Sequence, residues 1–288
     1  MFIIRPKKIY RIPRFSEVFG WDFLHMINNR TVFVLSLLLA SHCKGPTKSS
    51  ESRTDISINV IASHPHDQNA FTQGLFFKDG FLYESTGGYG TSSLRKIIPS
   101  TGEIIKNYTL EDRYFAEGAV FWNTDIIQLT WKSGIGLTYN ETPDGFFLQD
   151  KNFTYATEGW GLTSDFTHLI MSDGSEKLYF LDPVSKEILR VLKVSSNGHF
   201  VRNLNELEYI DHQIYANIWM KNEIAIIDPQ NGLVTARVPI NPAELLGDLY
   251  EKLGPEDVLN GIAYEPQSKH IFITGKNWPK IFEITINK

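Results

Sequence analysis

The sequence predicts an all-β protein built as a five-bladed β-propeller. From Ile56 onward, short runs of alternating apolar and polar residues are separated by Gly, Asp, Asn and Pro. One sequence unit recurs five times along this body, and a turn motif recurs between the units. A strand-rich unit repeated at this period is typical of a propeller blade. A pair of β-sandwiches is the rival architecture, but it does not explain a regular fivefold repeat.

The five copies share a polar amide or acid, then a small or apolar pair, a strand, a turn and a second strand. They begin roughly 40 to 55 residues apart, within the range of propeller blades. The copies are Phe71–Ser85, Phe115–Trp131, Ala156–Gly174, Asn203–Trp219 and Val258–Trp278. A single unit cannot bury both of its faces, whereas closing the ring covers all of them.

Turns and termini complete the predicted blades. Three copies of one motif, Ile98–Ile104, Asp182–Ile188 and Asp228–Val234, are predicted to be tight hairpins between outer strands, because proline presets φ and Gly or Asn accepts the left-handed position. Ile56–Ile61 lies outside the first copy, and we expect it to pair with Ile281–Ile286 and close the ring.

Convincing helical patterns are nearly absent from this body. The best candidate is Pro242–Leu253, which has Asn241 as a cap and proline at its first position.

Bulk composition limits the possible functions. The chain has 288 residues, 42% of them hydrophobic, so it can bury a large core in one or two domains. Its net charge of -5 makes nucleic acid a poor candidate partner. The one cysteine, Cys43, can form neither an internal disulfide nor a Cys-based zinc site.

The first 43 residues are predicted to be an export segment. Thr31–Ala40 is an apolar run of ten residues, short for a membrane span and typical of a signal-peptide core. We expect Met26 to be the true start, because residues 1–25 form an unusually long preface. The protein is therefore expected to be periplasmic or extracellular.

Cys43 resembles the acylated cysteine of a bacterial lipobox, although His42 stands where a small residue is expected. Lipidation at Cys43, plain secretion, and a retained anchor or unmodified cysteine stay open as alternatives. Residues 44–55 are polar and rich in Ser and Thr, so they predict a flexible tether. Residues 56–288 are the predicted propeller domain. A lipid anchor is the expected link to a membrane.

The polar residue that opens each copy is expected to face the central axis. These residues are Gln73, Glu117, Glu158, Asn205 or Glu206, and Asn260. Buried polar groups cost free energy unless they bond to one another, to water or to a ligand. The set therefore predicts either a ligand pocket or a hydrogen-bonded plug that holds the blades together.

Aromatic and basic residues strengthen the pocket interpretation. Trp131, Trp219 and Trp278 end their copies, and Trp160 follows the polar residue of its own copy. A ring of these four tryptophans would form a ligand cage, although packing between blades is the alternative. Lys276 stands where other copies carry apolar or small residues, and it would bind a carboxylate or stabilise developing negative charge unless it is an exposed loop lysine.

Several motifs, taken in order across the whole folded body, resemble the plant-type glutamine cyclotransferases, whose type enzyme comes from papaya latex. Those that carry the polar residues are Phe71–Leu75, Phe115–Gly118, Glu158–Leu162, Leu204–Glu208 and Leu259–Ala263. Each motif is weak alone, but their order across five copies is specific. The fold of that family is a five-bladed propeller.

The resemblance implies a glutaminyl-peptide cyclotransferase that converts N-terminal glutamine of peptides or proteins to pyroglutamate and releases ammonia. It assigns the acid/base role to Glu117, and substrate orientation or oxyanion stabilisation to Gln73 and Asn205. It places Lys276 in the same pocket. The residues expected around the substrate are Phe71, Phe115, Trp131, Trp160, Trp219, Glu158 and Asn260.

The implied mechanism needs no cofactor or metal. His64 and His66 form an H-x-H with no obvious third ligand, so we interpret them as strand or turn residues, and a structural calcium stays open. A metal-dependent, lactonase-like hydrolase and a non-catalytic peptide-binding propeller are the competing functions. Because a closed propeller has no free edges, we expect a monomer.

Overall fold

The computed structural model describes residues 56–287. The predicted export segment, Cys43 and the tether lie outside the described residues. Within residues 56–287, no helix is long and apolar enough to cross a membrane.

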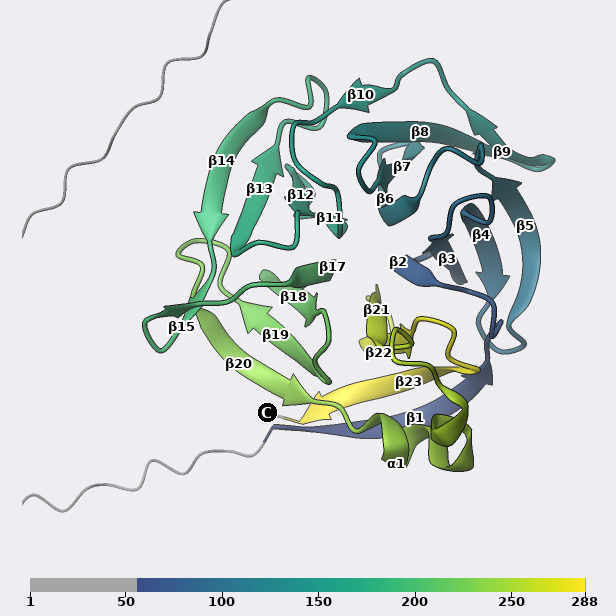
Figure 1. Ribbon diagram of the computed structural model, residues 1–288, viewed down its shortest axis with the longest axis vertical. Coiled ribbons are helices and arrows are strands. Elements are labelled where there is room, and N and C mark those ends of the chain that lie inside the picture. Colours follow the sequence, from purple (N-terminus) through teal and green to yellow (C-terminus); the bar gives the residue numbers. More distant parts are fainter. Residues whose placement is uncertain (1–55, 288) are drawn as a thin grey trace, which may run out of the picture. The chain divides into compact units, whose positions relative to one another are not determined.

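Five four-stranded antiparallel blades surround a central axis, which confirms the predicted fold (Figure 1). Blade 1 contains β2 (Thr72–Lys78), β3 (Phe81–Thr86), β4 (Ser93–Ile98) and β5 (Glu103–Thr109). Blade 2 contains β6 (Ala116–Trp122), β7 (Asp125–Thr130) and β8 (Ile135–Thr142), with an outer strand in two pieces, β9 (Gly145–Leu148) and β10 (Phe153–Thr154). Blade 3 contains β11 (Leu162–Ser164), β12 (Leu169–Ser172), β13 (Lys177–Leu181) and β14 (Ile188–Lys193).

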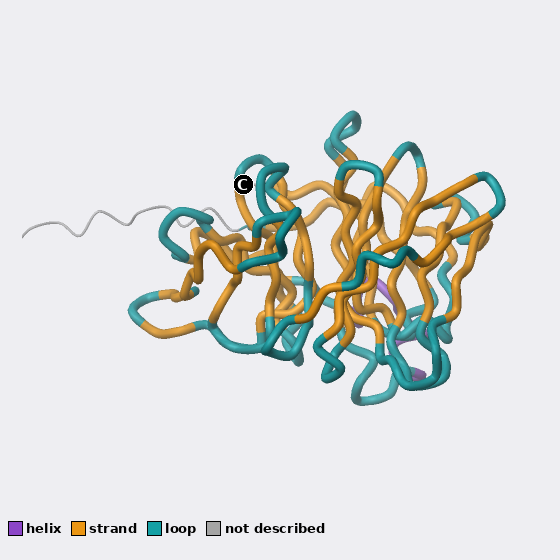
Figure 2. The backbone as a smooth tube through the Cα atoms, turned by 90° about the horizontal axis from the view of Figure 1, so that it is seen from above, coloured by secondary structure: helices purple, strands orange, loops and turns teal. Residues whose placement is uncertain are grey.

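A small hairpin joins blade 3 to blade 4 and consists of β15 (Ser195–Ser196) and β16 (His199–Phe200). Blade 4 contains β17 (Leu204–Ile210), β18 (Gln213–Ile218), β19 (Glu223–Ile227) and β20 (Val234–Pro239). Blade 5 contains β21 (Leu259–Glu265), β22 (His270–Gly275), β23 (Lys280–Asn287) and β1 (Ser57–Pro65). Seen from the side, the strands run between two faces formed by loops and turns (Figure 2).

The two ends of the chain share blade 5, and their pairing closes the ring. β1 pairs with β23 in an antiparallel register that runs from Ser57 opposite Asn287 to Pro65 opposite Lys280. This confirms the predicted pairing of Ile56–Ile61 with Ile281–Ile286. β1 thereby supplies the outermost strand of blade 5, so the beginning of the described chain is tied to its last blade.

Apolar residues fill the spaces between neighbouring blades. The buried residues form five hydrophobic clusters, and each cluster joins one pair of adjacent blades. In β7, for example, Ile126 packs toward blade 1 and Ile127 packs toward blade 3. A strand that is buried on both faces has an apolar run instead of alternation, which explains the continuous apolar sequence of many of these strands.

The turns and the helix follow from local sequence. All three Pro-containing motifs connect the third strand of a blade to its fourth strand, as predicted. The predicted helix is shorter than expected: α1 spans Pro242–Leu246 and continues as a 3₁₀ helix over Gly247–Lys252. Asn241 caps it by accepting a hydrogen bond from the backbone N–H of Glu244 at 3.4 Å. Gly247, with φ 56°, ends the α-helical part, since a left-handed residue cannot continue it.

The innermost strands approach one another closely at glycines. A Cβ on Gly118 of β6 would lie 2.4 Å from the backbone nitrogen of Leu162, and one on Gly161 would lie 2.0 Å from the carbonyl oxygen of Asn205. Gly118 also donates its N–H to the Trp160 carbonyl at 2.6 Å. These two glycines therefore let neighbouring blades make direct backbone contact along the axis.

Candidate active site

A pocket lies at the end of the axis where the innermost strands begin, and all five blades contribute to it. It encloses about 280 Å³, near the lower end of the range for ligand sites, which fits one amino-acid residue. Its lining consists of Phe71, Gln73, Phe115, Glu117, Trp131, Trp160, Asn205, Trp219, Glu256 and Lys276.

A recurrent irregularity of the innermost strands aims polar side chains into this pocket. The register between the first two strands of a blade shifts at Gln73, at Glu117–Gly118, at Asn205–Glu206 and at Asn260–Gly261. A bulge of this kind turns a side chain out of the strand alternation and is common beside active sites. Blade 3 has no such shift, because β11 begins only at Leu162, four residues after Glu158.

Glu117 is the acid at the floor of the pocket. Its side chain is only 4% exposed, and Oε1 accepts one hydrogen bond from the Gln73 amide at 3.2 Å. Burial raises the pKa of Glu117 well above its usual value, the nearby charge of Lys276 opposes this, and the charge of Glu158 adds to it. A carboxyl group whose pKa is raised well above its usual value can both accept and return a proton.

Lys276 provides the cation of the pocket. Its side chain is 5% exposed, and Nζ lies 4.7 Å from the centre of the Phe71 ring, which is a cation–π contact. Burial lowers the pKa of Lys276, while the charges of Glu117 and Glu256 raise it. The lysine therefore lies in a weakly solvated position where its charge acts strongly on neighbouring groups.

Glu158 holds two walls of the pocket instead of lining it. Its Oε2 accepts hydrogen bonds from the indole N–H of Trp131 at 2.6 Å and of Trp160 at 3.0 Å. Trp160 in turn meets Trp219 edge to face, with ring centroids 5.8 Å apart. Phe115 makes a similar contact with Trp131 at 5.6 Å. One carboxylate thus fixes the orientation of an aromatic wall that spans blades 2 to 4.

Two buried amides have different roles. Asn260 donates from Nδ2 to the carbonyl of Thr72 at 2.9 Å and to Oε1 of Gln73 at 3.3 Å, so it supports Gln73 from behind. Asn205 lines the pocket, and among the described residues its buried Oδ1 has no hydrogen-bond partner. Oδ1 of Asn260 also has no partner among the described residues, but Asn260 does not line the pocket. A buried acceptor without a partner is costly, so Asn205, which does line it, is suited to receive a donor from a ligand.

The structure therefore brings nine of the eleven predicted catalytic and substrate residues to the pocket surface, and Glu158 and Asn260 bond to residues that line it. Glu206, the alternative to Asn205, does not line the pocket and accepts hydrogen bonds from two backbone N–H groups. The expectation for Trp278 is wrong, because this side chain is fully buried in the core between blades 4 and 5 and donates to the Asp257 carbonyl.

Sequence reasoning missed Glu256. It lies at the exposed rim of the pocket, in the segment between the 3₁₀ helix and β21. It has no counterpart in the other copies, so the repeat pattern gave no signal for it. Its place two residues before the last copy was the available clue.

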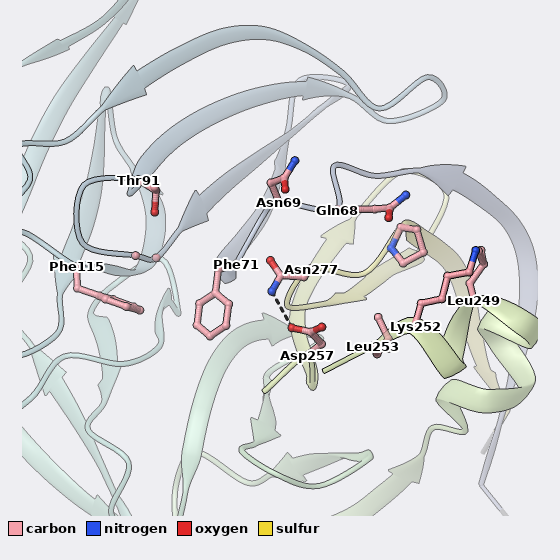
Figure 3. A pocket seen from close by; sticks show the side chains of 13 residues that line it. Gln68, Asn69, Phe71, Thr91, Phe115, Leu249, Lys252, Leu253, Asp257 and Asn277 are labelled. Carbon is pink, nitrogen blue, oxygen red and sulfur yellow. Dashed lines mark hydrogen bonds between the residues drawn. The ribbon is translucent and has the colours of Figure 1, made fainter. Parts of the chain in front are cut away.

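A second hollow of about 560 Å³ adjoins the pocket and shares Phe71 and Phe115 with it (Figure 3). Its opposite side comes from the helical segment and the last copy, where Asp257 accepts a hydrogen bond from the Asn277 amide at 2.7 Å. Lys252 and Leu253 also line it. The hollow is more open and more polar in character than the pocket, so it can accept the main chain of an extended peptide.

The donor set of the pocket suits proton transfer better than metal binding. Its only carboxylates are Glu117 and Glu256, and Lys276 lies among them as a competing cation. Among the described residues, a cluster that could hold a metal ion occurs on three successive strands of blade 5 instead, with Glu265, His270 and Glu283.

Comparisons with known proteins agree with this geometry. A family model described as glutamine cyclotransferase matches residues 33–286. A glutaminyl-peptide cyclotransferase from Arabidopsis thaliana is 36% identical over 247 residues, covering 84% of this chain and 76% of the relative. The crystal structure of Myxococcus xanthus glutaminyl cyclase superimposes with a TM-score of 0.74 at 35% identity, covering 81% of this chain and 97% of that one.

Proposed function

The chain belongs to the glutamine cyclotransferase family, and from this premise we propose that it converts the N-terminal glutamine of peptides or proteins to pyroglutamate with release of ammonia. One observation carries the mechanism: Glu117 is a buried carboxyl group with a raised pKa, and it has a single side-chain donor, Gln73, in a pocket that fits one residue. Such a group is available for chemistry instead of being committed to the fold.

The reaction is an intramolecular aminoacyl transfer. The α-amine of the substrate attacks the carbon of its own γ-carboxamide, and Glu117 takes the proton that the amine loses. A tetrahedral intermediate forms, with one new C–N bond and a negatively charged oxygen. Glu117 then returns the proton to the departing nitrogen, the original C–N bond breaks, and ammonia leaves the five-membered lactam.

The remaining residues orient the substrate and stabilise charge. Lys276 lies near Glu117 in a position of low solvation, where it stabilises the developing oxyanion. Asn205 accepts a hydrogen bond from the substrate through its free Oδ1, and Gln73 keeps Glu117 in place. The aromatic wall forces the glutamine side chain to fold back toward its own amine, and this orientation provides much of the rate enhancement.

The residues after the first one leave the pocket through the adjoining hollow. Phe71 and Phe115 are in edge-to-face contact and belong to both cavities, so a chain whose first residue is in the pocket passes over these two rings. The hollow offers Asn69 and Asn277 as polar partners for a peptide backbone. This supports peptides and proteins as substrates.

The proposal includes the cellular setting. We infer that the enzyme is exported and acts in the periplasm or outside the cell, because Thr31–Ala40 has the pattern of a signal-peptide core. Acylation of Cys43 would tether it to a membrane through residues 44–55. The closed ring supports a monomer, and no cofactor is needed for the proposed steps.

Two other functions make different demands. A non-catalytic peptide binder would tolerate loss of the Glu117 carboxyl group, and a metal-dependent hydrolase would need several acids around the axis pocket. The pocket combines one buried acid with a lysine and two amides, which is unlike the several acids that a metal-dependent hydrolase would need. Turnover of a Glu117 variant distinguishes the cyclotransferase from a peptide binder.

A direct assay tests the proposal. The purified chain is incubated with a peptide that begins with glutamine, beside the same peptide beginning with asparagine, with and without a chelator. We expect loss of one ammonia from the glutamine peptide alone, insensitive to the chelator, measured by ammonia release and by mass. A rate no higher than the spontaneous one would refute the proposed activity.

A further inference from the structure

A cluster of metal-binding side chains lies on blade 5, away from the pocket lining. Ligand atoms of Glu265, His270 and Glu283 all lie within 4.8 Å of one another, and all three side chains are partly exposed. In addition, His270 Nδ1 contacts Oε1 of Glu283. A ligand set of one imidazole and two carboxylates is suited to a divalent transition metal.

Strand register explains why these residues meet. Glu265 at the end of β21 is directly opposite His270 at the start of β22. In the next pair of strands, Phe272 is opposite Glu283. Alternate residues of a strand share a face, so His270, Phe272 and Glu283 lie on the same side of the blade. Three successive strands therefore present one ligand each to the same point.

Two further side chains orient the carboxylates. His64 of β1 lies with Nε2 3.0 Å from Oε2 of Glu283, on the oxygen that faces away from His270. Ser268 donates to Oε2 of Glu265 at 2.6 Å. Supporting hydrogen bonds to ligating carboxylates are a regular feature of metal sites, since they fix the free oxygen of each ligand.

We propose that Glu265, His270 and Glu283 bind one divalent transition-metal ion, with Zn²⁺ as the best fit and His64 as an orienting residue. Zinc accepts imidazole nitrogen and carboxylate oxygen at about 2.0–2.2 Å in a tetrahedron, and water completes three protein ligands. The ligand atoms of such a tetrahedron are about 3.3 Å apart, so small side-chain movements suffice. Calcium is a poorer fit because it prefers oxygen ligands.

The position of the site gives the metal a structural purpose. β1 comes from the beginning of the described chain and β23 from its end, and their pairing closes the ring. The metal would join β21, β22 and β23, and through His64 it would also hold β1. An ion that binds the folded chain and not the unfolded chain stabilises the fold. The proposed metal therefore reinforces the closure of the propeller.

The alternative is an ordinary group of ion pairs without a metal. The chain provides a matched control for it, because His168 and Asp165 form another histidine–carboxylate pair, at 3.0 Å, on blade 3. That pair belongs to no candidate metal cluster among the described residues. A plain ion-pair role would make the two histidines behave alike toward zinc.

The test is a titration of the purified, chelator-treated full chain with Zn²⁺ alone, followed by calorimetry and by thermal unfolding. We expect one zinc per chain, and a rise in Tm of roughly 5–10 °C at a hundredfold excess over Kd. His270→Ala should weaken binding by more than about a hundredfold, and His64→Ala by about 10- to 100-fold. His168→Ala should leave the affinity within about twofold of the wild type.

Glu265→Gln is the second variant if His270→Ala does not fold, because it removes one ligand at a partly exposed position. Absence of zinc binding by the wild-type chain would overturn the proposal. Equal affinities of His270→Ala or Glu265→Gln and His168→Ala would also overturn it. Turnover of the glutamine peptide at 25 °C is a separate readout, and we expect metal removal to leave it unchanged.

Discussion

Buried carboxyl groups occupy both halves of the propeller axis, but they are bound in different ways. In the pocket, Glu117 accepts a hydrogen bond from one side chain, that of Gln73. Further along the axis, Glu206 accepts from the backbone N–H groups of Leu75 at 3.1 Å and of Ile262 at 2.9 Å. Glu208, near the opposite mouth, accepts from the Tyr264 N–H at 3.1 Å.

Burial raises the pKa of all three glutamates, so the pKa alone does not distinguish a catalytic acid from a structural one. Their partners make the distinction. Glu206 joins β17 to β2 and β21, and it thereby links three blades across the axis. Glu117 leaves most of its hydrogen-bonding capacity free and faces a cavity. We therefore propose that Glu117 takes part in the reaction, whereas Glu206 holds the blades together.

The largest effect should follow from Glu117→Gln. This change keeps the shape and the contact with Gln73 but removes the proton acceptor, so kcat should fall by about 10³-fold. Turnover of a glutamine peptide measures the loss, and circular dichroism with thermal unfolding checks the fold. The same substitution at Glu206 is the control, because it also removes a buried axis acid. If a folded Glu117→Gln variant retains its turnover, Glu117 is not the acid/base residue.

A smaller loss is expected from Lys276→Met, which keeps the apolar stem and removes the charge. Without the cation near the oxyanion, kcat should fall by about 10²-fold. Lys252→Met is a control at the adjoining hollow, and it should change kcat by less than about twofold, because Lys252 does not line the pocket. Equal effects of the two substitutions would show that Lys276 has no special electrostatic role.

Glu206→Gln should affect stability instead of turnover. An amide presents one N–H₂ group toward a backbone N–H, so one hydrogen bond is lost and the unfolding free energy should fall by about 1–3 kcal/mol. Urea unfolding measures the change, and turnover per folded molecule should stay within about twofold of the wild type. A variant with unchanged stability but reduced turnover would reverse the roles that the comparison assigns to the two acids.

The pH dependence of stability gives a second view of Glu206. Its folded pKa is raised, so the unfolded chain loses its proton first as pH rises. Stability from this group is therefore complete below the unfolded glutamate pKa of about 4.3 and is lost as pH rises toward the folded value. Glu206→Gln should remove that part of the slope.

The sequence predicted the fold and most of the pocket because both are repeated. Five copies of one strand pattern determine the number of blades, and in four copies the polar residue is the second residue of the innermost strand. Sequence alone could not show that blade 3 lacks the bulge, so it could not separate Glu158, which holds two tryptophans, from residues that line the cavity.

Residues outside the repeat were harder to predict. Trp278 ends its copy as Trp131 and Trp219 do, yet it is fully buried in the core. Glu256 reaches the pocket only through tertiary structure. The three residues of the proposed metal cluster also meet only through tertiary structure, since they are on three different strands. The two histidines of the H-x-H motif also have different partners, which the sequence did not show. His66 bonds to Glu84 at 2.8 Å, whereas His64 contacts Glu283.

The smallest expected effect is a shift in the pH profile of turnover. It distinguishes the two charged neighbours of Glu117, because Glu158 and Lys276 act on its pKa in opposite directions. kcat/KM should fall as pH falls through the pKa of Glu117, since the base must be ionised. The charge of Glu158 raises that pKa, so Glu158→Gln should move the acidic limb to lower pH, while its amide oxygen can still accept from the tryptophans. Lys276 lowers the same pKa, so Lys276→Met should move the limb upward. Measuring kcat/KM of both variants across the pH range gives the two shifts of the acidic limb. Shifts in the same direction would contradict the assignment of that limb to Glu117.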